Sequence, residues 1–359
     1  MTQARKTLIA LEDTSMYHCY VRCVRASYLC GEDAVSGRNF DHRKQWLVSR
    51  IRFLSYLFSI DVCAYSIMSN HYHVILHVDL ARARLWSDEE VVERWLQLYN
   101  GHVLIDRWLE QAEMSEAELD KVAEIIARWR ERLSSISWFM RCINETIARM
   151  ANKEDGCHGR FWEGRFKSQA LLDEVALLSC MAYVDLNPIR AGMETDLAES
   201  DFTSIQQRLF DYAKHKQKQA HTTAEKSVMA RVEQQRELKR QLELDELPSA
   251  QLMPFSGSSH VSIHTALPFT REDYFALVDQ TGRAIREDKK GYISAEQQPL
   301  LERLGIDSDN WIDQVRDFGK LYGNCVGAEY RIVDFSQRFN KRWSKGVRRS
   351  RLLYGKVAA

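Results

Sequence analysis

The hydrophobic and polar positions of the first 80 residues predict three strands. His18–Arg25 is short and rich in β-forming residues, and so are Ile60–Met68 and His71–Val78. Only Ser69-Asn70 separates the last two runs. Two small polar residues in so short a gap favour a tight turn, so we expect these two strands to form a hairpin.

Elsewhere the apolar residues recur with helical spacing. Charged, helix-prone sequence fills residues 81–132, where two S-x-x-E capping boxes mark helix starts. Other helices are predicted over Asp41–Phe58, Ile136–Asn152 and Asp173–Leu186. Pro188 ends the last of these because it lacks an N–H and restricts the residue before it. A basic, glycine-containing loop covers Lys153–Gln169.

The C-terminal part of the chain differs in composition. Polar, helix-prone sequence fills Ser204–Glu246, and Leu247–Pro268 holds three of the five prolines, which predicts a linker. The end of the module that follows, FNKRWSKGVRRSRLLYGK, carries seven basic residues and no acidic one. We expect a domain over 14–200 with a helical insertion at 81–132, a helical connector and linker over 201–268, and a helical module with a basic tail over 269–359.

Composition narrows the class of protein. Fifty basic residues balance 50 acidic ones in 359 residues, which argues against nonspecific coating of nucleic acid but leaves room for a local basic groove. The eight cysteines include no C-x-x-C pair, so a zinc ribbon has little support. The sequence shows no secretion signal and no run long enough to span a membrane. We expect a cytoplasmic protein.

Two histidines in the second predicted hairpin strand are the first candidate for chemistry. His71 and His73 point to the same face of a strand, so their imidazoles can converge on one metal ion. A two-residue turn would place Ser66 opposite His73. His77 shares the face but lies about 13 Å further along, too far to join. Because H-x-H is common on strands, a packed pair of core histidines is the alternative.

The helix Asp173–Leu186 offers a second candidate. Tyr183 and Asn187 are four residues apart and so lie on one helical face. The small residues Ala176 and Cys180 continue that face and leave space in front of the phenol. The alternative is a core tyrosine followed by an Asn-Pro helix stop.

Cations and aromatic residues alternate in the basic loop before this helix. They are Arg160, Phe161, Trp162, Arg165, Phe166 and Lys167. Cations suit phosphates and flat rings suit unstacked bases, a pattern typical of single-strand binding. The alternative is that the aromatic rings pack in the core. Arg22, Arg190 and the basic tail are further candidates for DNA contact.

Together these pieces resemble the REP-associated tyrosine transposases, which are relatives of the single-tyrosine HUH transposases of bacterial insertion sequences. Three blocks in the family's order carry the resemblance: SIMSNHYHVIL (66–76), GRFWEGRFK (159–167) and YVDLNPIRAG (183–192). The resemblance covers about 15–200, interrupted by 81–132. It implies an α+β fold in which helices flank an antiparallel sheet, with a helical insertion and a mostly helical C-terminal extension.

The resemblance also implies the chemistry. Tyr183 would be the nucleophile, and His71, His73 and Asn187 would hold a divalent metal, Mg²⁺ or Mn²⁺. The substrate would be single-stranded, hairpin-forming DNA, cut and rejoined through a 5′-phosphotyrosine. Tyr72, at a position often apolar in relatives, would face away from the metal. Relatives are monomers or homodimers, and a DNA-bound protein would associate with the nucleoid.

Two other functions are compatible with the residues. The first is a DNA-binding regulator that descends from such an enzyme and no longer needs cleavage. The second is a metal-dependent hydrolase of another substrate, in which Tyr183 is only structural. Formation of a covalent protein–DNA adduct separates the transposase-type reaction from both.

Overall fold

The computed structural model describes residues 9–24, 29–31, 37–219, 248, 250–256, 266–285, 298–304, 306 and 308–354. Most of the predicted connector and linker, at 220–247 and 257–265, lies outside these residues. No helix in the described ranges is long and apolar enough to cross a membrane.

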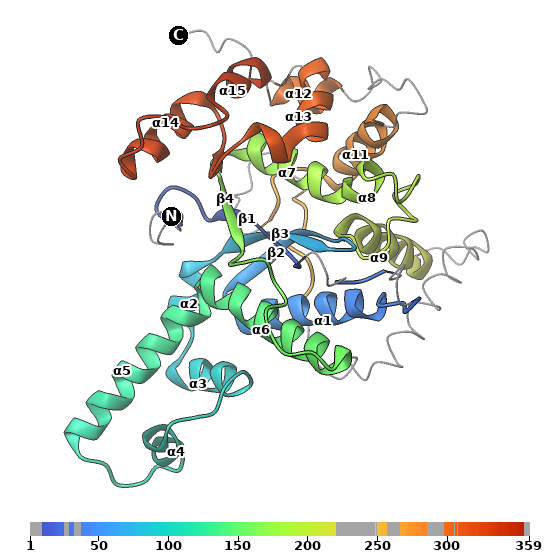
Figure 1. Cartoon of the computed structure of the whole chain (residues 1–359). Coiled ribbons are helices and arrows are strands. Elements are labelled where there is room, and N and C mark those ends of the chain that lie inside the picture. The colour runs from blue at the N-terminus through green and yellow to red at the C-terminus, as the bar shows by residue number, and fades with distance from the viewer. Residues whose placement is uncertain are drawn as a thin grey trace.

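A five-stranded sheet forms the centre of the molecule, in the order β2-β3-β1-β4-β5. The strands are β1 (Met16–Arg22), β2 (Ile60–Ile67), β3 (His71–Val78), β4 (Lys167–Leu171) and β5 (Cys325–Val326). Neighbouring strands are antiparallel except for β4 and β5, which run parallel. Helices flank this sheet, which confirms the predicted α+β class (Figure 1).

The hairpin of β2 and β3 has the predicted register. Ser66 lies opposite His73, and the Met68 N–H donates to the carbonyl of His71 at 2.8 Å across the Ser69-Asn70 turn. Strand side chains alternate between faces, so His71 and His73 share one face of β3 while Tyr72 points to the other. The Tyr72 hydroxyl donates to Asn144 on that other face at 2.8 Å.

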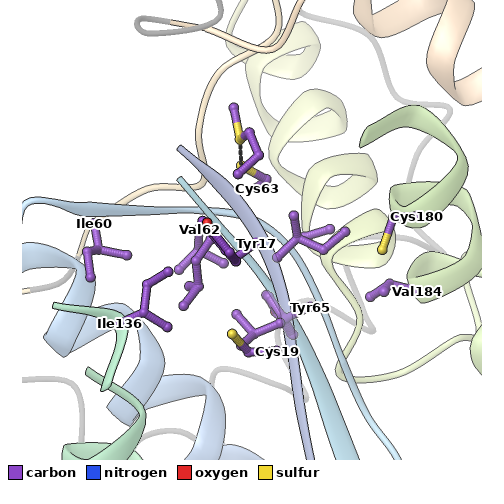
Figure 2. Close-up of a cluster of buried hydrophobic side chains, with 14 of the residues drawn as sticks. Tyr17, Cys19, Ile60, Val62, Cys63, Tyr65, Ile136, Cys180 and Val184 are labelled. Carbon is purple, nitrogen blue, oxygen red and sulfur yellow. Dashed lines mark hydrogen bonds between the residues drawn. The ribbon is translucent and has the colours of Figure 1, made fainter. Parts of the chain in front are cut away.

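Helices cover both faces of the sheet. Figure 1 shows α1 (His42–Leu57) and α6 (Ile136–Asp155) below it, with α7 (Glu174–Asp185) and the short α8 (Asn187–Arg190) above it. Figure 2 shows apolar side chains of β1 and β2 meeting Ile136 of α6 and Cys180 of α7. The whole length of α7 from Val175 to Asp185 is buried. This burial makes α7 a core helix that holds Tyr183 rigidly over the sheet.

The predicted insertion is helical and extends away from the sheet as an arm (Figure 1). Its helices are α2 (Leu80–Leu85), α3 (Asp88–Leu96), α4 (Val103–Leu109) and α5 (Glu116–Leu133). Both predicted capping boxes are present, at Ser87 and Ser115. Trp95 stacks on Trp129 with ring centroids 5.3 Å apart, which joins α3 to α5.

The C-terminal helices pack on the same core as the sheet. They are α9 (Ser204–Gln219), α11 (Arg271–Ile285), α12 (Gln298–Arg303), α13 (Ser308–Leu321), α14 (Glu329–Arg338) and α15 (Val347–Leu353). α13 lies against α7 (Figure 1). β5 extends the sheet at the edge of β4. Trp311 and Phe318 of α13 are fully buried. Residues more than 100 positions apart therefore share the core above the sheet.

One buried carboxylate joins α7 to α9 and α11. Asp185, at the end of α7, accepts hydrogen bonds from the Ser204 hydroxyl and from the Ile205 N–H at 3.0 Å. Its other oxygen accepts from the Tyr274 hydroxyl of α11 at 2.5 Å. Burial raises the pKa of Asp185 to about 6. The sequence offers no sign of this junction, because its partners lie 19 to 89 residues away.

Candidate functional site

The structure brings the predicted tyrosine and histidines together. The His71 and His73 rings lie on one face of β3 with centroids 5.0 Å apart. The Tyr183 ring of α7 meets His73 edge-on, at a centroid distance of 5.6 Å. His73 is 4% exposed, and His71 is partly exposed. The two histidines and the tyrosine predicted to carry the chemistry therefore converge above the centre of the sheet.

A third histidine, which the sequence analysis passed over, lies against His73. On the adjacent strand β1, His18 places its Nε2 2.8 Å from Nδ1 of His73. Nδ1 of His18 lies 3.3 Å from Oε1 of Gln169, and the Gln169 amide nitrogen donates to the carbonyl of Gly323 at 2.7 Å. Gln169, His18 and His73 are all buried. Hydrogen bonds thus run from the C-terminal module through three strands to His73.

This chain of hydrogen bonds assigns the tautomer of His73. The Gln169 amide oxygen only accepts, so Nδ1 of His18 carries the proton and its Nε2 is the acceptor. Nδ1 of His73 must then be the donor to His18. Nε2 of His73 keeps its lone pair and is buried with no partner among the described residues. An imidazole fixed in this way by its other nitrogen is the arrangement that metal-binding histidines use.

The tautomer of His71 is fixed in the same sense, but by a single hydrogen bond to the residue before it. Its Nδ1 lies 2.7 Å from Oδ1 of Asn70, which only accepts, so its Nε2 also carries the lone pair. Burial, together with the nearby positive charges of Arg22 and Arg190, lowers the pKa of His71 to about 4. Burial also holds the pKa of His73 well below its usual value. Both imidazoles are therefore neutral at pH 7, as ligands must be.

The space predicted in front of the phenol is occupied. Phe318 of α13 stacks on the Tyr183 ring at a centroid distance of 5.1 Å. Gly319 follows it, and a Cβ at that position would lie 2.8 Å from the Tyr183 hydroxyl. Tyr183 is 8% exposed. The expectation of open space was wrong because small residues on α7 face a packed neighbour, and α13 closes the site.

Asn187 and Arg190 complete the surroundings of Tyr183. The guanidinium of Arg190 lies 4.5 Å from the centre of the Tyr183 ring. It donates to Oδ1 of Asn187 at 3.1 Å and to the carbonyl of Arg316 in α13 at 2.9 Å. Burial raises the pKa of Tyr183, and the positive charge of Arg190 opposes that shift. The Tyr183 phenol is therefore protonated at neutral pH.

The types of donor atom in His71, His73 and Asn187 suit a divalent metal. Two imidazole nitrogens with open lone pairs and an amide oxygen form a neutral N/N/O set, of a kind that Mg²⁺ or Mn²⁺ can use. Asn187 is 5% exposed, its amide nitrogen has no partner among the described residues, and its oxygen has a second lone pair beside the Arg190 contact. The described residues contain no group of three or more His, Cys, Asp or Glu that could hold a metal ion.

The aromatic residues of the basic loop do not form an open stacking face. Phe161, Trp162 and Phe166 are buried, and the Trp162 indole donates to the carbonyl of Asn144 at 2.9 Å. The Trp162 ring also packs edge-on against Tyr72. The prediction of base stacking there was wrong, because all three rings are buried in the core, with Phe161 and Trp162 packed against each other next to Tyr72. The cations of the loop remain outside: Arg160, Arg165 and Lys167 are exposed.

A second tyrosine also lies at the site. Tyr20 of β1 sits opposite His73 and stacks on its ring at a centroid distance of 5.4 Å. Burial and the proximity of Tyr183 both raise the pKa of Tyr20. Lys167 lies 5.6 Å from the centre of its ring, and Arg22 is exposed two residues further along β1. His18 and Tyr20 are two residues apart and so lie on one face of β1. The pairing of β1 with β3 therefore places both beside His73.

The sequence matches no family model and no curated protein. Among solved structures, the chain is similar to a REP-associated tyrosine transposase bound to a REP hairpin. The two chains share 14% sequence identity, and the TM-score is 0.34. The similarity covers 58% of this chain and 84% of that chain.

Proposed function

We propose that this protein cleaves and rejoins single-stranded DNA, with Tyr183 as nucleophile and with His71, His73 and Asn187 as ligands of a divalent metal. The observation that carries the proposal is the position of the Tyr183 phenol beside a neutral imidazole whose Nε2 lone pair is open. The three sequence blocks that resemble REP-associated tyrosine transposases add the substrate class, a hairpin-forming single strand.

The reaction is a transesterification. The Tyr183 oxygen forms a bond to the scissile phosphorus, and the bond from phosphorus to the 3′ oxygen breaks. The phenol loses one proton and the leaving 3′ oxygen gains one, so the products are a 5′-phosphotyrosine and a free 3′-OH. A bound divalent metal supplies positive charge that stabilises the phosphate and the leaving oxygen. Rejoining reverses the same steps and needs no ATP.

The surrounding residues position the nucleophile. Phe318 on one ring face and the Arg190 guanidinium near the ring hold the phenol against His73. Arg190 also fixes Asn187 through its amide oxygen. Because Tyr183 and His73 are almost fully buried, DNA reaches them only when the α13 side chains move from the phenol.

A labelled single-stranded hairpin tests the proposal directly. In Mn²⁺ or Mg²⁺, we expect the protein to form a denaturation-resistant adduct that carries the label, and EDTA is expected to abolish it. DNA binding without an adduct would favour the regulator. Neither binding nor an adduct would favour a hydrolase of another substrate.

His18 is expected to set metal affinity without touching the metal. His18→Phe removes the acceptor for Nδ1–H of His73 but keeps a ring of similar size, so the lone pair of His73 is no longer fixed on Nε2. Loss of such a partner lowers metal affinity about 10- to 100-fold. Titration with Mn²⁺, followed by electron paramagnetic resonance of the free ion, measures the affinity.

His77→Phe is the matched control. His77 lies on β3 and is buried, as His18 is, but it pairs with Asp61 at 3.1 Å, away from the site. We expect this control to keep the wild-type Mn²⁺ affinity. Equal affinities in wild type, His18→Phe and His77→Phe would contradict the role of His18 and leave the nucleophile assignment untouched.

A further inference from the structure

The basic tail forms one side of a cavity far from Tyr183 in sequence. This cavity of about 610 Å³ lies between α14, α15 and the turn that joins them. Its volume is in the range of small-ligand sites. We call it the C-terminal basic cavity and define it by the following lining residues: Lys341, Arg342, Trp343, Lys345, Arg348 and Arg351.

Positive charge is concentrated here, although the whole chain is neutral. Five lining residues are basic, and Glu329 is the one acidic residue that lines the cavity. Glu329 is already paired with Arg351 by two hydrogen bonds, one of them 2.6 Å long. In the part of the chain that the structure describes, Arg342, Lys345 and Arg348 are exposed and have no ion pair. These three cations are available to an anion.

An exposed indole stands among these cations. Trp343 is 77% exposed, whereas Trp311 in the same module is fully buried. A large ring kept in water next to unpaired cations has no role in folding that the structure shows. A flat aromatic face beside positive charges is the combination that binds an unstacked base together with its phosphates.

The backbone holds this arrangement in place. Two residues after α14 ends at Arg338, Asn340 adopts the left-handed region at φ 54°, and the Lys341 N–H donates to the carbonyl of Ser336 at 3.0 Å. Gly346 has a φ of 114°, and a Cβ there would lie 2.3 Å from the Tyr322 ring. The Gly323 N–H donates to the carbonyl of Lys345 at 3.3 Å. The loop is therefore built against the core before any ligand arrives.

We propose that the C-terminal basic cavity binds single-stranded nucleic acid, with phosphates on Arg342, Lys345 and Arg348 and an unpaired base stacked on Trp343. The lining residues include none of those proposed for cleavage, and binding here does not depend on cleavage. The cavity would hold a second stretch of strand, outside the residues that react.

Fluorescence anisotropy with the full chain in EDTA tests the proposal. The probe is a labelled oligothymidylate of about 20 nucleotides, titrated at several salt concentrations. Arg342→Gln, Lys345→Gln and Arg348→Gln combined should reduce the slope of log K against log salt by about 2, since each single-strand phosphate contact contributes about 0.7. Trp343→Ala should weaken binding about tenfold, and Trp343→Phe should retain most of it.

A matched triple variant controls for loss of charge. Lys121→Gln, Arg128→Gln and Arg84→Gln remove three exposed cations from the arm and should leave the slope unchanged. Equal slopes in the cavity and arm variants would overturn the proposal. Wild-type binding in Trp343→Ala, or equal binding of duplex DNA or anionic vesicles, would also overturn it. A labelled RNA of the same length distinguishes the two sources of strand.

Discussion

Tyr183→Phe is expected to abolish the covalent protein–DNA adduct, with a loss of about 10³-fold or more in cleavage. The substitution removes only the oxygen that would attack phosphorus. The ring stays, so its stacking on Phe318 and its contact with Arg190 are retained. Cleavage of a labelled hairpin, resolved on denaturing gels, measures the effect, and circular dichroism checks that the variant folds.

Tyr20→Phe is the control that the site itself provides. Tyr20 is the other phenol beside His73, so it is the tyrosine most able to replace Tyr183. We expect Tyr20→Phe to keep the adduct. If the adduct persists in Tyr183→Phe and disappears in Tyr20→Phe, the nucleophile is Tyr20. Persistence in both single variants and in the double variant would contradict a tyrosine nucleophile.

The second large effect is a change of the free energy of unfolding with pH, caused by the buried carboxyl group of Asp185. The pKa of Asp185 is about 6 in the folded protein, compared with 3.8 as its ordinary value. A raised folded-state pKa means that the protonated carboxyl is favoured by folding. Its contribution is complete below pH 3.8 and is lost as the pH rises through about 6. Two pKa units correspond to about 3 kcal/mol in the free energy of unfolding.

Asp185→Asn removes this titration and keeps the shape of the side chain. We expect the difference in unfolding free energy between wild type and Asp185→Asn to change by about 2 kcal/mol between pH 4 and pH 7, in favour of wild type at the acid end. Urea denaturation at a series of pH values measures both proteins. A difference independent of pH would show that Asp185 does not titrate in this range.

Local elements were predictable from the sequence because their signals are local. The hairpin register followed from the two-residue turn at Ser69-Asn70, and the structure confirms it. The periodicity of Asp41–Phe58 and the capping boxes at Ser87 and Ser115 likewise placed helices correctly. Each of these signals depends on residues a few positions apart.

What surrounds the candidate site was not predictable in the same way. His18 and Gln169 meet only because β1 pairs with both β3 and β4, a contact across 151 residues. Phe318 reaches Tyr183 from a helix beyond the predicted linker, and no periodicity encodes that contact. The base-stacking prediction for the aromatic loop was wrong for a related reason. The alternation of cations and rings in the sequence does not show whether Phe161 and Trp162 face solvent or the core.

The hydrogen bond from Gln169 to the carbonyl of Gly323 has a consequence for biosynthesis. The tautomer of His73 is set through a backbone carbonyl that lies 250 residues after it in the chain (323 minus 73). A nascent polypeptide can form the hairpin and α7 long before position 323 leaves the ribosome. Until then, the imidazole lacks its fixed orientation and the phenol lacks its cover. The candidate site is therefore completed only after Phe318 and Gly323 have been synthesised, later than the strands and the helix that carry the histidines and Tyr183.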